Sequence, residues 1–398
     1  MKTNRISPIS GQKKSIMDLA QIPAPCYVLD EKGLRKNLKL MNRVKTESGV
    51  YIICAFKGYA MWSSFPLVRQ YLDGATASSL YEARLCFEEM KSLAHTYAAV
   101  YFPNDFDDIM RFSSHISFNS LSQFHRYHPS VKEWNKGDSH KISCGIRINP
   151  EYSVIETDLY NPSKAGGRLG EDLKNFKGTL PEDIEGIHVH ALCESSAEDT
   201  EGLIQRVEQI IGDWLPQLKW LNLGGGHLMT RPGYNVDHLI KVLKSFKEKY
   251  PNLDVILEPG SAVGWNTGVL VSKVLDIVNN HGVKTLMIDA SFTAHMPDTL
   301  EMPYRPRIVG ATDPVEGKPT YRIGGTSCLS GDYMAEYSFD KEINVGDTII
   351  FEDMIHYTMV KTSMFNGIPH PSIGIWTEDD TFKLVRKFGY EDYKNRLS

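Results

Sequence analysis

The sequence lacks a long hydrophobic run, a paired-cysteine motif and an excess of positive charge. No apolar stretch in its 398 residues approaches the length that crosses a bilayer, and residues 1–14 lack the apolar core of a secretory leader. The six cysteines lie far apart, and none forms the C-x-x-C spacing of a zinc or redox site. The formal net charge of −5 predicts no large basic surface for nucleic acid. We therefore expect a cytoplasmic protein with free thiols and no metal site, which binds neither membranes nor nucleic acid.

What the sequence does contain, from about residue 30 to 260, is an alternation of short apolar runs and amphipathic stretches. Eight runs have the length and apolar content of buried strands. They are Tyr51–Ala55, Gly74–Ala77, Tyr97–Tyr101, His115–Phe118, Ile142–Ile148, Gly186–His190, Trp220–Leu223 and Val255–Leu257. Helical patterns at Leu80–Met90, Ile204–Trp214 and Val236–Tyr250 lie between them. Eight β-α alternations predict a (β/α)8 barrel, with a doubly wound open sheet as the alternative.

The pattern changes after Gly260. Strand-like runs separated by Gly, Pro and Asp follow, and no long helix is evident. These runs are Val269–Val278, Thr285–Asp289, Thr348–Phe351 and Ser372–Trp376. We therefore predict two domains, a barrel over residues 28–265 and a mostly β domain formed by residues 1–27 and 266–398.

A (β/α)8 barrel carries its chemistry at the carboxyl ends of its strands, and five motifs fall there. They are Lys57, Arg147, His190, Gly224-Gly225-Gly226 and Glu258-Pro259-Gly260. Lys57 follows a buried strand, and burial lowers the pKa of a lysine amine. An amine that is neutral part of the time can form a Schiff base with an aldehyde cofactor. The alternative is a lysine that ends a strand and extends into solvent.

The other barrel motifs also have more than one interpretation. The triple glycine can close its N–H groups around a phosphate or simply form a tight turn. Glu258 can pair with a protonated ring nitrogen or satisfy a neighbouring loop. His188 and His190 lie on the same side of one strand, so they can bind a metal or fill the core, and His190 can stack on a flat cofactor. A metal-dependent barrel hydrolase is therefore a second candidate, although no further His and Asp ligands accompany the pair.

Two motifs of the predicted β domain also carry chemistry. Cys328 and Asp332 lie in a glycine-rich loop, where a thiol with a tuned pKa can act as an acid or base. An inert buried thiol is the alternative. Tyr357 can bond a phosphate or fill the core.

In their order along the chain, these motifs resemble those of the fold-type III pyridoxal-phosphate decarboxylases, which include ornithine, diaminopimelate and biosynthetic arginine decarboxylases. The resemblance is carried by Ala55-Phe56-Lys57, His190, Gly224-Gly225-Gly226-His227, Glu258-Pro259-Gly260, Cys328-x-x-x-Asp332 and Tyr357. It spans nearly the whole chain. Within the family, the runs Pro23–Leu29, Ile288–Asp298 and Cys328–Asp332 are similar to those of the branch that acts on carboxynorspermidine and carboxyspermidine.

The resemblance implies a barrel of the alanine-racemase type with a β-barrel-like domain, in a head-to-tail homodimer with active sites at the interface. Lys57 would carry pyridoxal phosphate, His190 would stack on its ring, and Glu258 would keep the ring nitrogen protonated. Arg147 would lie near the ring. The implied phosphate contacts are Gly224, Gly225, Gly226, Gly260 and Tyr357. Cys328 of the partner subunit would be the general acid. The partner subunit would also supply the loop that carries Asp332.

The implied substrate is a carboxylated triamine, decarboxylated to norspermidine or spermidine in polyamine biosynthesis. Its ammonium groups need carboxylate partners, for which Glu301 and Asp332 are the candidates. Two departures matter. Leu329 replaces an aspartate of ornithine decarboxylases, which disfavours ornithine, and Ser261 replaces an arginine of several relatives, which weakens one phosphate contact or leaves it to another group. Decarboxylation of ornithine, lysine or diaminopimelate, racemisation on the same cofactor, and non-catalytic regulation remain as alternatives.

Overall fold

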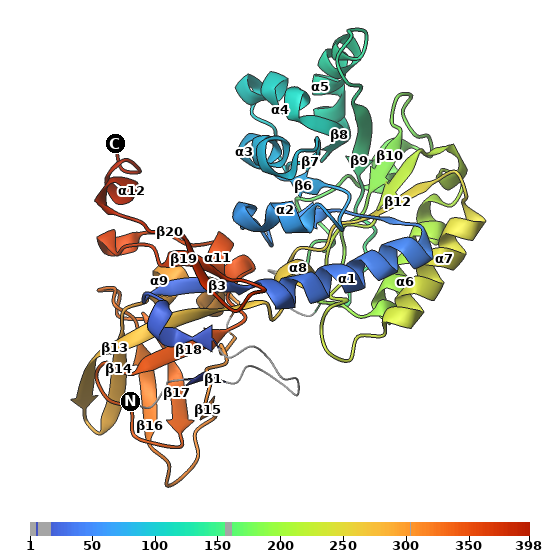
Figure 1. Ribbon diagram of the computed structural model, residues 1–398. Helices are drawn as coiled ribbons and strands as arrows, with labels where there is room; N and C mark the ends of the chain where they lie inside the picture. The colour runs from blue at the N-terminus through green and yellow to red at the C-terminus, as the bar shows by residue number, and fades with distance from the viewer. Residues whose placement is uncertain (1–4, 7–16, 156–160, 303) are drawn as a thin grey trace. The chain divides into compact units, whose positions relative to one another are not determined.

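The chain forms two compact units, one of residues 36–263 and one that combines residues 1–35 with 264–398. The computed structural model describes residues 5–6, 17–155, 161–302 and 304–398. Figure 1 shows strands enclosed by helices in the first unit, and a second unit that consists mostly of strands. We call them the barrel unit and the β unit.

The barrel unit is built on one parallel sheet that closes on itself. Its strand order is β4-β12-β11-β10-β9-β8-β7-β6-β5, and all neighbouring pairs are parallel. β4 (Tyr51–Ile52) and β5 (Cys54–Ala55) are two segments of one extended run, separated only by Ile53. The first and last strands of this order are therefore joined through the chain. Eight strand positions result, which confirms the predicted (β/α)8 barrel.

The remaining barrel strands are short. They are β6 (Ala75–Ala77), β7 (Ala94–Tyr97), β8 (Ser113–Phe118), β9 (Ser143–Arg147), β10 (Gly186–His188), β11 (Trp220–Asn222) and β12 (Asp254–Leu257). One prediction was wrong in position, because the third strand ends at Tyr97, where the predicted run Tyr97–Tyr101 begins. Tyr101 is buried, and its hydroxyl donates to the carbonyls of Thr96 and Ser117. The apolar character of the run therefore reflects packing in the core.

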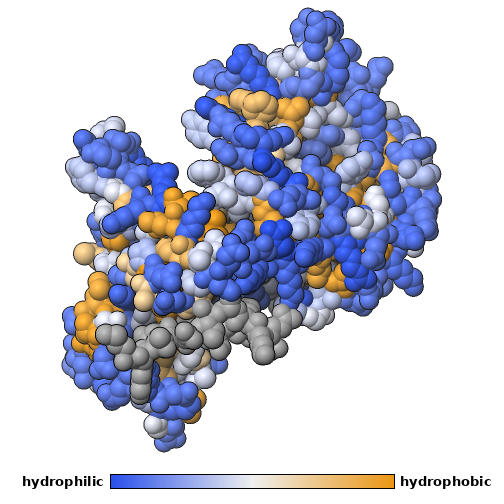
Figure 2. All heavy atoms as spheres, viewed as in Figure 1, coloured by the Kyte–Doolittle hydropathy of each residue, from blue (hydrophilic) through white to orange (hydrophobic). Residues whose placement is uncertain are grey.

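Amphipathic helices cover the outside of the strand ring. Their bounds are α1 (Glu31–Ser48), α2 (Phe65–Val68), α3 (Leu80–Leu85), α4 (Phe106–Phe112), α5 (Leu121–Trp134), α6 (Ala197–Ile211), α7 (Val236–Lys249) and α8 (Ser261–Gly264). α6 begins seven residues before the predicted Ile204, because Ser196 and Asp199 form a capping box ahead of it. Its apolar residues, Leu203 and Val207 among them, are buried, and the outward faces of the helices are largely hydrophilic (Figure 2).

The β unit is a nine-stranded mixed sheet with the order β15-β17-β16-β14-β13-β3-β19-β20, in which β18 also pairs with β13. β13 (Gly268–Asn280) is long enough to serve three partners. Its first half pairs with β3 and β18, and its second half pairs with β14 beyond an irregularity at Val274. The other strands are β3 (Cys26–Asp30), β14 (Val283–Ile288), β15 (Ala311–Thr312), β16 (Thr320–Gly324), β17 (Tyr333–Phe339), β18 (Thr348–Glu352), β19 (Ser372–Trp376) and β20 (Phe382–Arg386).

Short helices and one small strand pair complete the β unit. The helices are α9 (Phe292–His295), α10 (Asp298–Glu301), α11 (Tyr357–Val360) and α12 (Tyr390–Lys394), and the pair is β1 (Arg5–Ile6) with β2 (Met17–Asp18). Residues 1–4 and 7–16 of the segment predicted to join this domain lie outside the described residues. No helix among the described residues combines the length and apolarity that crossing a membrane requires.

Candidate active site

The parallel strands of the barrel unit bring the predicted barrel residues to one edge. Arg147, His188 and Asn222 occupy matched positions on β9, β10 and β11. Two residues further along the chain, His190 and Gly224 follow the ends of β10 and β11, and Glu258 follows β12. Because carboxyl ends of parallel strands meet, residues more than a hundred positions apart become neighbours.

Lys57 lies at this edge, just after β5. Lys57 is an exposed residue, and its Nζ lies 3.2 Å from His190 Nε2. The crowded protein around the amine, which removes part of its hydration, lowers the pKa of Lys57, and the Arg147 guanidinium lowers it further. Glu258 opposes this shift. A lysine whose pKa is lowered supplies the neutral amine that attacks a carbonyl carbon.

His190 is held by the glycine turn as well as by Lys57. The Gly225 N–H donates to His190 Nδ1 at 3.0 Å. Burial and the nearby Lys57 and Arg147 charges lower the pKa of His190 well below its usual range, so the ring is neutral. With Nδ1 accepting, the single ring proton resides on Nε2 and faces the lysine amine.

Glu258 is a buried carboxylate with one strong donor. It is 7% exposed, and Asn222 Nδ2 donates to its Oε1 at 2.6 Å. Burial raises the pKa of Glu258, while the hydrogen bond from Asn222 and the charge of Lys57 act in the opposite direction. The backbone N–H of Glu258 donates to Gly224 O, which fixes the carboxylate to the glycine turn.

Arg147 is a buried residue of the site that is held by two backbone carbonyls. Its guanidinium Nη2 donates to the carbonyls of Pro162 and His190, both at 3.1 Å. The side chain is 2% exposed and lies over the ring of Tyr97 at 4.9 Å. The positive charge of Arg147 is therefore fixed in position, and it lowers the pKa values of Lys57 and His190.

The glycine turn Gly224-Gly225-Gly226 admits no side chains. Gly224 and Gly226 have φ of +69° and +94°, and a Cβ on Gly225 would approach Glu258 O to 2.6 Å. The N–H groups of Gly224 and Gly225 donate to Asn222 and His190. The turn therefore positions His190 and Glu258, and its phosphate contacts stay a prediction.

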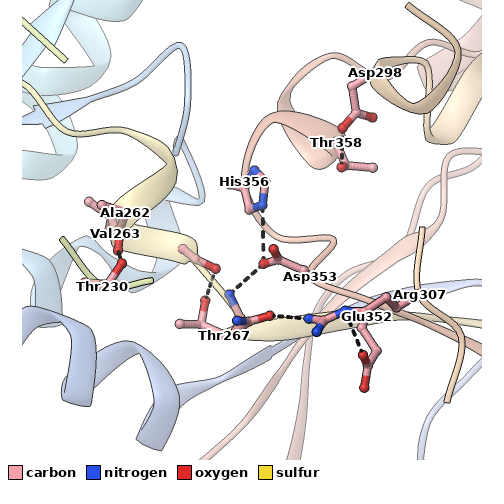
Figure 3. Close-up of polar contacts among 12 residues, drawn as sticks. Thr230, Ala262, Val263, Thr267, Asp298, Arg307, Glu352, Asp353, His356 and Thr358 are labelled. Atoms are coloured by element: carbon pink, nitrogen blue, oxygen red, sulfur yellow. Dashed lines mark hydrogen bonds and ion pairs between the residues drawn. The ribbon is translucent and has the colours of Figure 1, made fainter. Parts of the chain in front are cut away.

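A second close approach joins Gly260 to the Lys57 segment. A Cβ on Gly260 would meet Gly58 Cα at 3.0 Å, and the Ala55 N–H donates to Pro259 O. Gly260 is followed by α8, where Thr230 Oγ1 donates to Ala262 O at 2.6 Å (Figure 3). The role of Gly260 as a phosphate contact stays a prediction.

Two contacts of Glu258 were not predicted from the sequence. Asn222 bridges Glu258 and the Gly224 N–H, and His188 lies 3.6 Å from Glu258 through its Nε2. The signal was available for Asn222, since it stands two residues before the glycine turn on the same face of β11. No group of three or more His, Cys, Asp or Glu side chains suited to a metal ion occurs among the described residues.

In the β unit, the predicted acid and its neighbour have different surroundings. Cys328 is exposed, and its N–H donates to Asn366 Oδ1 at 2.9 Å. Asp332 is 4% exposed and accepts hydrogen bonds from three backbone N–H groups, those of Phe292, Thr293 and Ser327. Asp332 thus ties the Cys328 loop to α9, and its role as a ligand of the substrate stays a prediction.

Glu301 and Tyr357 lie on short helices of the same unit. Glu301 pairs with Lys361. Tyr357 is the first residue of α11, and Thr358 Oγ1 donates to Asp298 Oδ2 at 2.7 Å (Figure 3). Nothing in these contacts selects a phosphate or an ammonium ligand, so both assignments stay predictions.

The segment before Tyr357 is fixed by a chain of polar contacts. The His356 Nε2 lies 3.3 Å from Asp353 Oδ1, which also accepts the N–H of Asn266. Asn266 Oδ1 in turn accepts from Arg307, which pairs with Glu352 (Figure 3). This network holds the start of α11 against β18.

Taken together, the barrel residues fit an aldehyde-bearing cofactor with a basic ring nitrogen. Lys57, an exposed residue, offers an amine whose pKa is lowered. Glu258 offers a buried carboxylate with one donor already in place. The glycine turn has no side chains, so it presents only backbone groups at the same edge. An amine and a carboxylate held at one strand edge suit a Schiff-base reaction whose electron pair is drawn to a protonated ring.

Comparison with known proteins is consistent with this chemistry. Residues 26–355 match the family model described as pyridoxal-dependent decarboxylase, C-terminal sheet domain. The chain is 48% identical to carboxyaminopropylagmatine decarboxylase of Synechocystis over 95% of its length and 96% of the relative. It is 40% identical to carboxynorspermidine/carboxyspermidine decarboxylase of Campylobacter jejuni, over 94% of this chain and 99% of that one.

A solved structure is similar over the same extent. Carboxynorspermidine decarboxylase from Campylobacter jejuni, crystallised with norspermidine, superposes with a TM-score of 0.87 at 39% sequence identity. The match covers 94% of this chain and all of the other. At this identity the likeness extends beyond the fold to the sequence of most of the chain.

Proposed function

Because the chain belongs to the pyridoxal-dependent decarboxylases, we propose that it removes the carboxylate of carboxynorspermidine or carboxyspermidine with pyridoxal phosphate as cofactor. The observation that carries the proposal is the presence of Lys57, an exposed residue whose pKa is lowered, and of the buried Glu258 carboxylate at the same edge of the barrel. The products are norspermidine or spermidine and CO2. The relatives named for these substrates, with identities of 40% and 35%, support the choice of a carboxylated triamine.

Bound pyridoxal phosphate supplies an electron sink for the electron pair that CO2 leaves behind. Lys57 would supply the neutral amine that bonds the aldehyde carbon, and His190 would direct the Nε2 proton towards that amine. Glu258, held in place by Asn222, would keep a proton on the ring nitrogen. Arg147 holds the strand end that carries His190. The phosphate is assigned to Gly224, Gly225, Gly226, Gly260 and Tyr357.

The remaining roles belong to the β unit of a second copy of the chain. We propose a cytoplasmic homodimer in which Cys328 of the partner subunit gives the proton to the carbon that has lost CO2. The exposure of Cys328 suits a thiol that must meet a substrate. Glu301 and Asp332 are the proposed carboxylates for the ammonium groups. Each is already engaged, by Lys361 and by backbone N–H groups respectively, so binding would require an exchange of partners.

A second substrate has specific support. The Synechocystis relative, at 48% identity, is named for carboxyaminopropylagmatine. That molecule ends in a guanidinium, whereas carboxyspermidine ends in an ammonium. A guanidinium is planar and bonds a carboxylate in two places, so the two substrates require differently shaped ends of the pocket.

The deciding experiment measures CO2 release from six amino acids side by side, with pyridoxal phosphate present. They are carboxynorspermidine, carboxyspermidine, carboxyaminopropylagmatine, ornithine, lysine and diaminopimelate. Release mainly from carboxynorspermidine or carboxyspermidine supports the proposal. Release mainly from carboxyaminopropylagmatine would make that molecule the substrate. Release mainly from ornithine, lysine or diaminopimelate keeps the mechanism and refutes the substrate. Inversion of a substrate stereocentre without CO2 release would refute decarboxylation.

A further inference from the structure

His188 lies next to Glu258 with no other hydrogen-bonding role. The side chain is 2% exposed, and neither ring nitrogen has a hydrogen-bond partner among the described residues. Its Nε2 is 3.6 Å from Glu258 Oε2. A neutral imidazole carries one N–H, and burying that donor without an acceptor costs free energy. The carboxylate is the acceptor within closest reach.

The surroundings of His188 keep the ring neutral. Its pKa is lowered well below the usual range, first by burial and then by the charges of Arg147 and Lys57, with His95 acting in the same direction. The edge of Tyr97 packs against the ring, with centroids 5.0 Å apart. The titratable and charged groups that face Glu258 and His188 are Lys57, His95, Tyr97, Arg147 and His190. The Arg147 guanidinium, and Lys57 when it is protonated, favour the ionised form of Glu258.

The side chains of Asn222, Thr76 and His188 lie against the Glu258 carboxylate. Asn222 Nδ2 donates to Oε1 at 2.6 Å, while His188 Nε2 faces Oε2. Asn222 Oδ1 is fixed by the Gly224 N–H, which sets the direction of its amide. The two supporting side chains occupy matched register positions on β10 and β11. They form one layer of the barrel interior directly below the carboxylate.

We propose that His188 is a positioning residue whose Nε2–H donates to Glu258 Oε2 and, with Asn222, holds that carboxylate ionised and fixed in direction. The 3.6 Å separation closes by a small rotation of either side chain, as hydrogen bonds at active sites often tighten on loading. Its value to the ring nitrogen of a bound cofactor rests on the proposed function. The hydrogen bond itself does not, because it forms within the protein alone.

The proposal distinguishes two conservative replacements of His188. In His188→Gln the amide nitrogen takes the place of Nε2, so the donor to Glu258 is retained. In His188→Asn the amide lies near the position of Nδ1 and cannot reach Oε2. His188→Leu removes the donor altogether. His238→Gln is the matched control, because His238 Nε2 forms a similar pair with Glu201 at 2.9 Å between α7 and α6.

The primary measurement is infrared titration of the Glu258 carboxyl in cofactor-free protein, assigned by its loss in Glu258→Gln. The ratio of protonated to ionised Glu258 at a given pH should rise about tenfold in H188N and H188L, the effect of losing one hydrogen bond to a charged group. H188Q and H238Q should match the wild type. Equal titration in H188Q, H188N and the wild type would overturn the proposal.

A second measurement guards against loss of folding in the leucine variant. The ¹⁵N histidine spectrum of the wild-type protein should place the His188 proton on Nε2, with a signal that moves in Glu258→Gln. A proton on Nδ1 would overturn the proposal. These readouts are independent of CO2 release. A protein that shows the predicted titration but releases no CO2 refutes the proposed function alone, and the reverse result refutes the positioning role alone.

Discussion

Lys57 Nζ lies 3.2 Å from His190 Nε2, and the Gly225 N–H occupies the other ring nitrogen of that histidine. Because the ring is neutral and Nδ1 accepts, Nε2 carries the ring proton and faces the lysine amine. Only an uncharged amine can accept a hydrogen bond from this N–H group. The contact between the two residues thus favours the neutral, nucleophilic form of Lys57, in agreement with its lowered pKa.

Replacement of Lys57 tests whether its neutral amine is required. Lys57→Ala should abolish both CO2 release and the absorbance of the lysine-bound cofactor. Lys57→Arg keeps length and charge but is never neutral, so it should fail equally. Absorbance spectra and CO2 release check both variants. Turnover in Lys57→Arg comparable with the wild type would show that charge, and not nucleophilicity, is what the site needs.

Arg147 should influence the pH below which the rate of cofactor uptake falls. Its guanidinium is one of the causes that lower the pKa of Lys57, so Arg147→Met should raise that pKa. Uptake needs the neutral amine, which is present above the pKa. The acidic limb of the uptake rate should therefore move to higher pH in Arg147→Met and stay near its wild-type position in Arg147→Lys. Stopped-flow absorbance on cofactor-free protein measures the limb, and identical limbs in all three proteins would contradict the electrostatic role.

Gly225 should tolerate no side chain. The added Cβ would lie 2.6 Å from Glu258 O, which is backbone and cannot move aside. We expect Gly225→Ala to lose about 1–3 kcal/mol of stability and to weaken cofactor uptake. Gly137→Ala is the control in the same unit, because its Cβ meets only Trp134 O at 3.4 Å. Thermal unfolding compares the two, and equal melting temperatures would refute the steric argument.

The sequence was sufficient to predict which residues converge in the barrel. Lys57, His190 and Glu258 each follow a predicted strand, and the topology of a parallel barrel brings all strand ends to one edge. The supporting contacts were not predictable. Whether His188 turns towards Glu258 depends on side-chain packing around Tyr97, which no periodicity encodes.

The limits of sequence patterns are also visible in the β unit. β17 was not predicted, because an extra residue between Met334 and Tyr337 breaks the alternation of buried and exposed positions that reveals a strand. Glu301 was expected to be available to a substrate, yet it pairs with Lys361, sixty residues further along the chain. Such a pair depends on how two short helices meet, and the sequence around each gives no sign of it.

Stability should fall in acid through buried histidines, of which His227 is the clearest. It is 1% exposed, and burial lowers its pKa to about 4. The unfolded chain binds this proton near pH 6.5, so the stability contributed by neutral His227 is lost as pH falls from about 6.5 towards 4. Between pH 7 and 5 the loss is about 2 kcal/mol. His227→Asn can keep the bond to Thr200 and should show a smaller decrease by that amount.

Denaturant unfolding at pH 7 and pH 5 measures this decrease. His281→Asn is the control, since His281 is exposed and its positive φ of 49° suits asparagine. The control should lose as much stability as the wild type on acidification. If His227→Asn also behaves as the wild type, the acid sensitivity arises elsewhere.

Asp332 offers a test between two roles that the structure makes distinct. Its Oδ1 accepts from Phe292 and Thr293 N–H, and its Oδ2 accepts from Ser327 N–H. Asp332→Asn places an amide donor against one of these N–H groups, which should cost about 2 kcal/mol and lower the melting temperature. Asp379→Asn, at an exposed carboxylate of the same unit, should leave it unchanged. If Asp332→Asn instead keeps its melting temperature but raises KM for the triamine at constant kcat, Asp332 is a substrate ligand and not the organiser of the Cys328 loop.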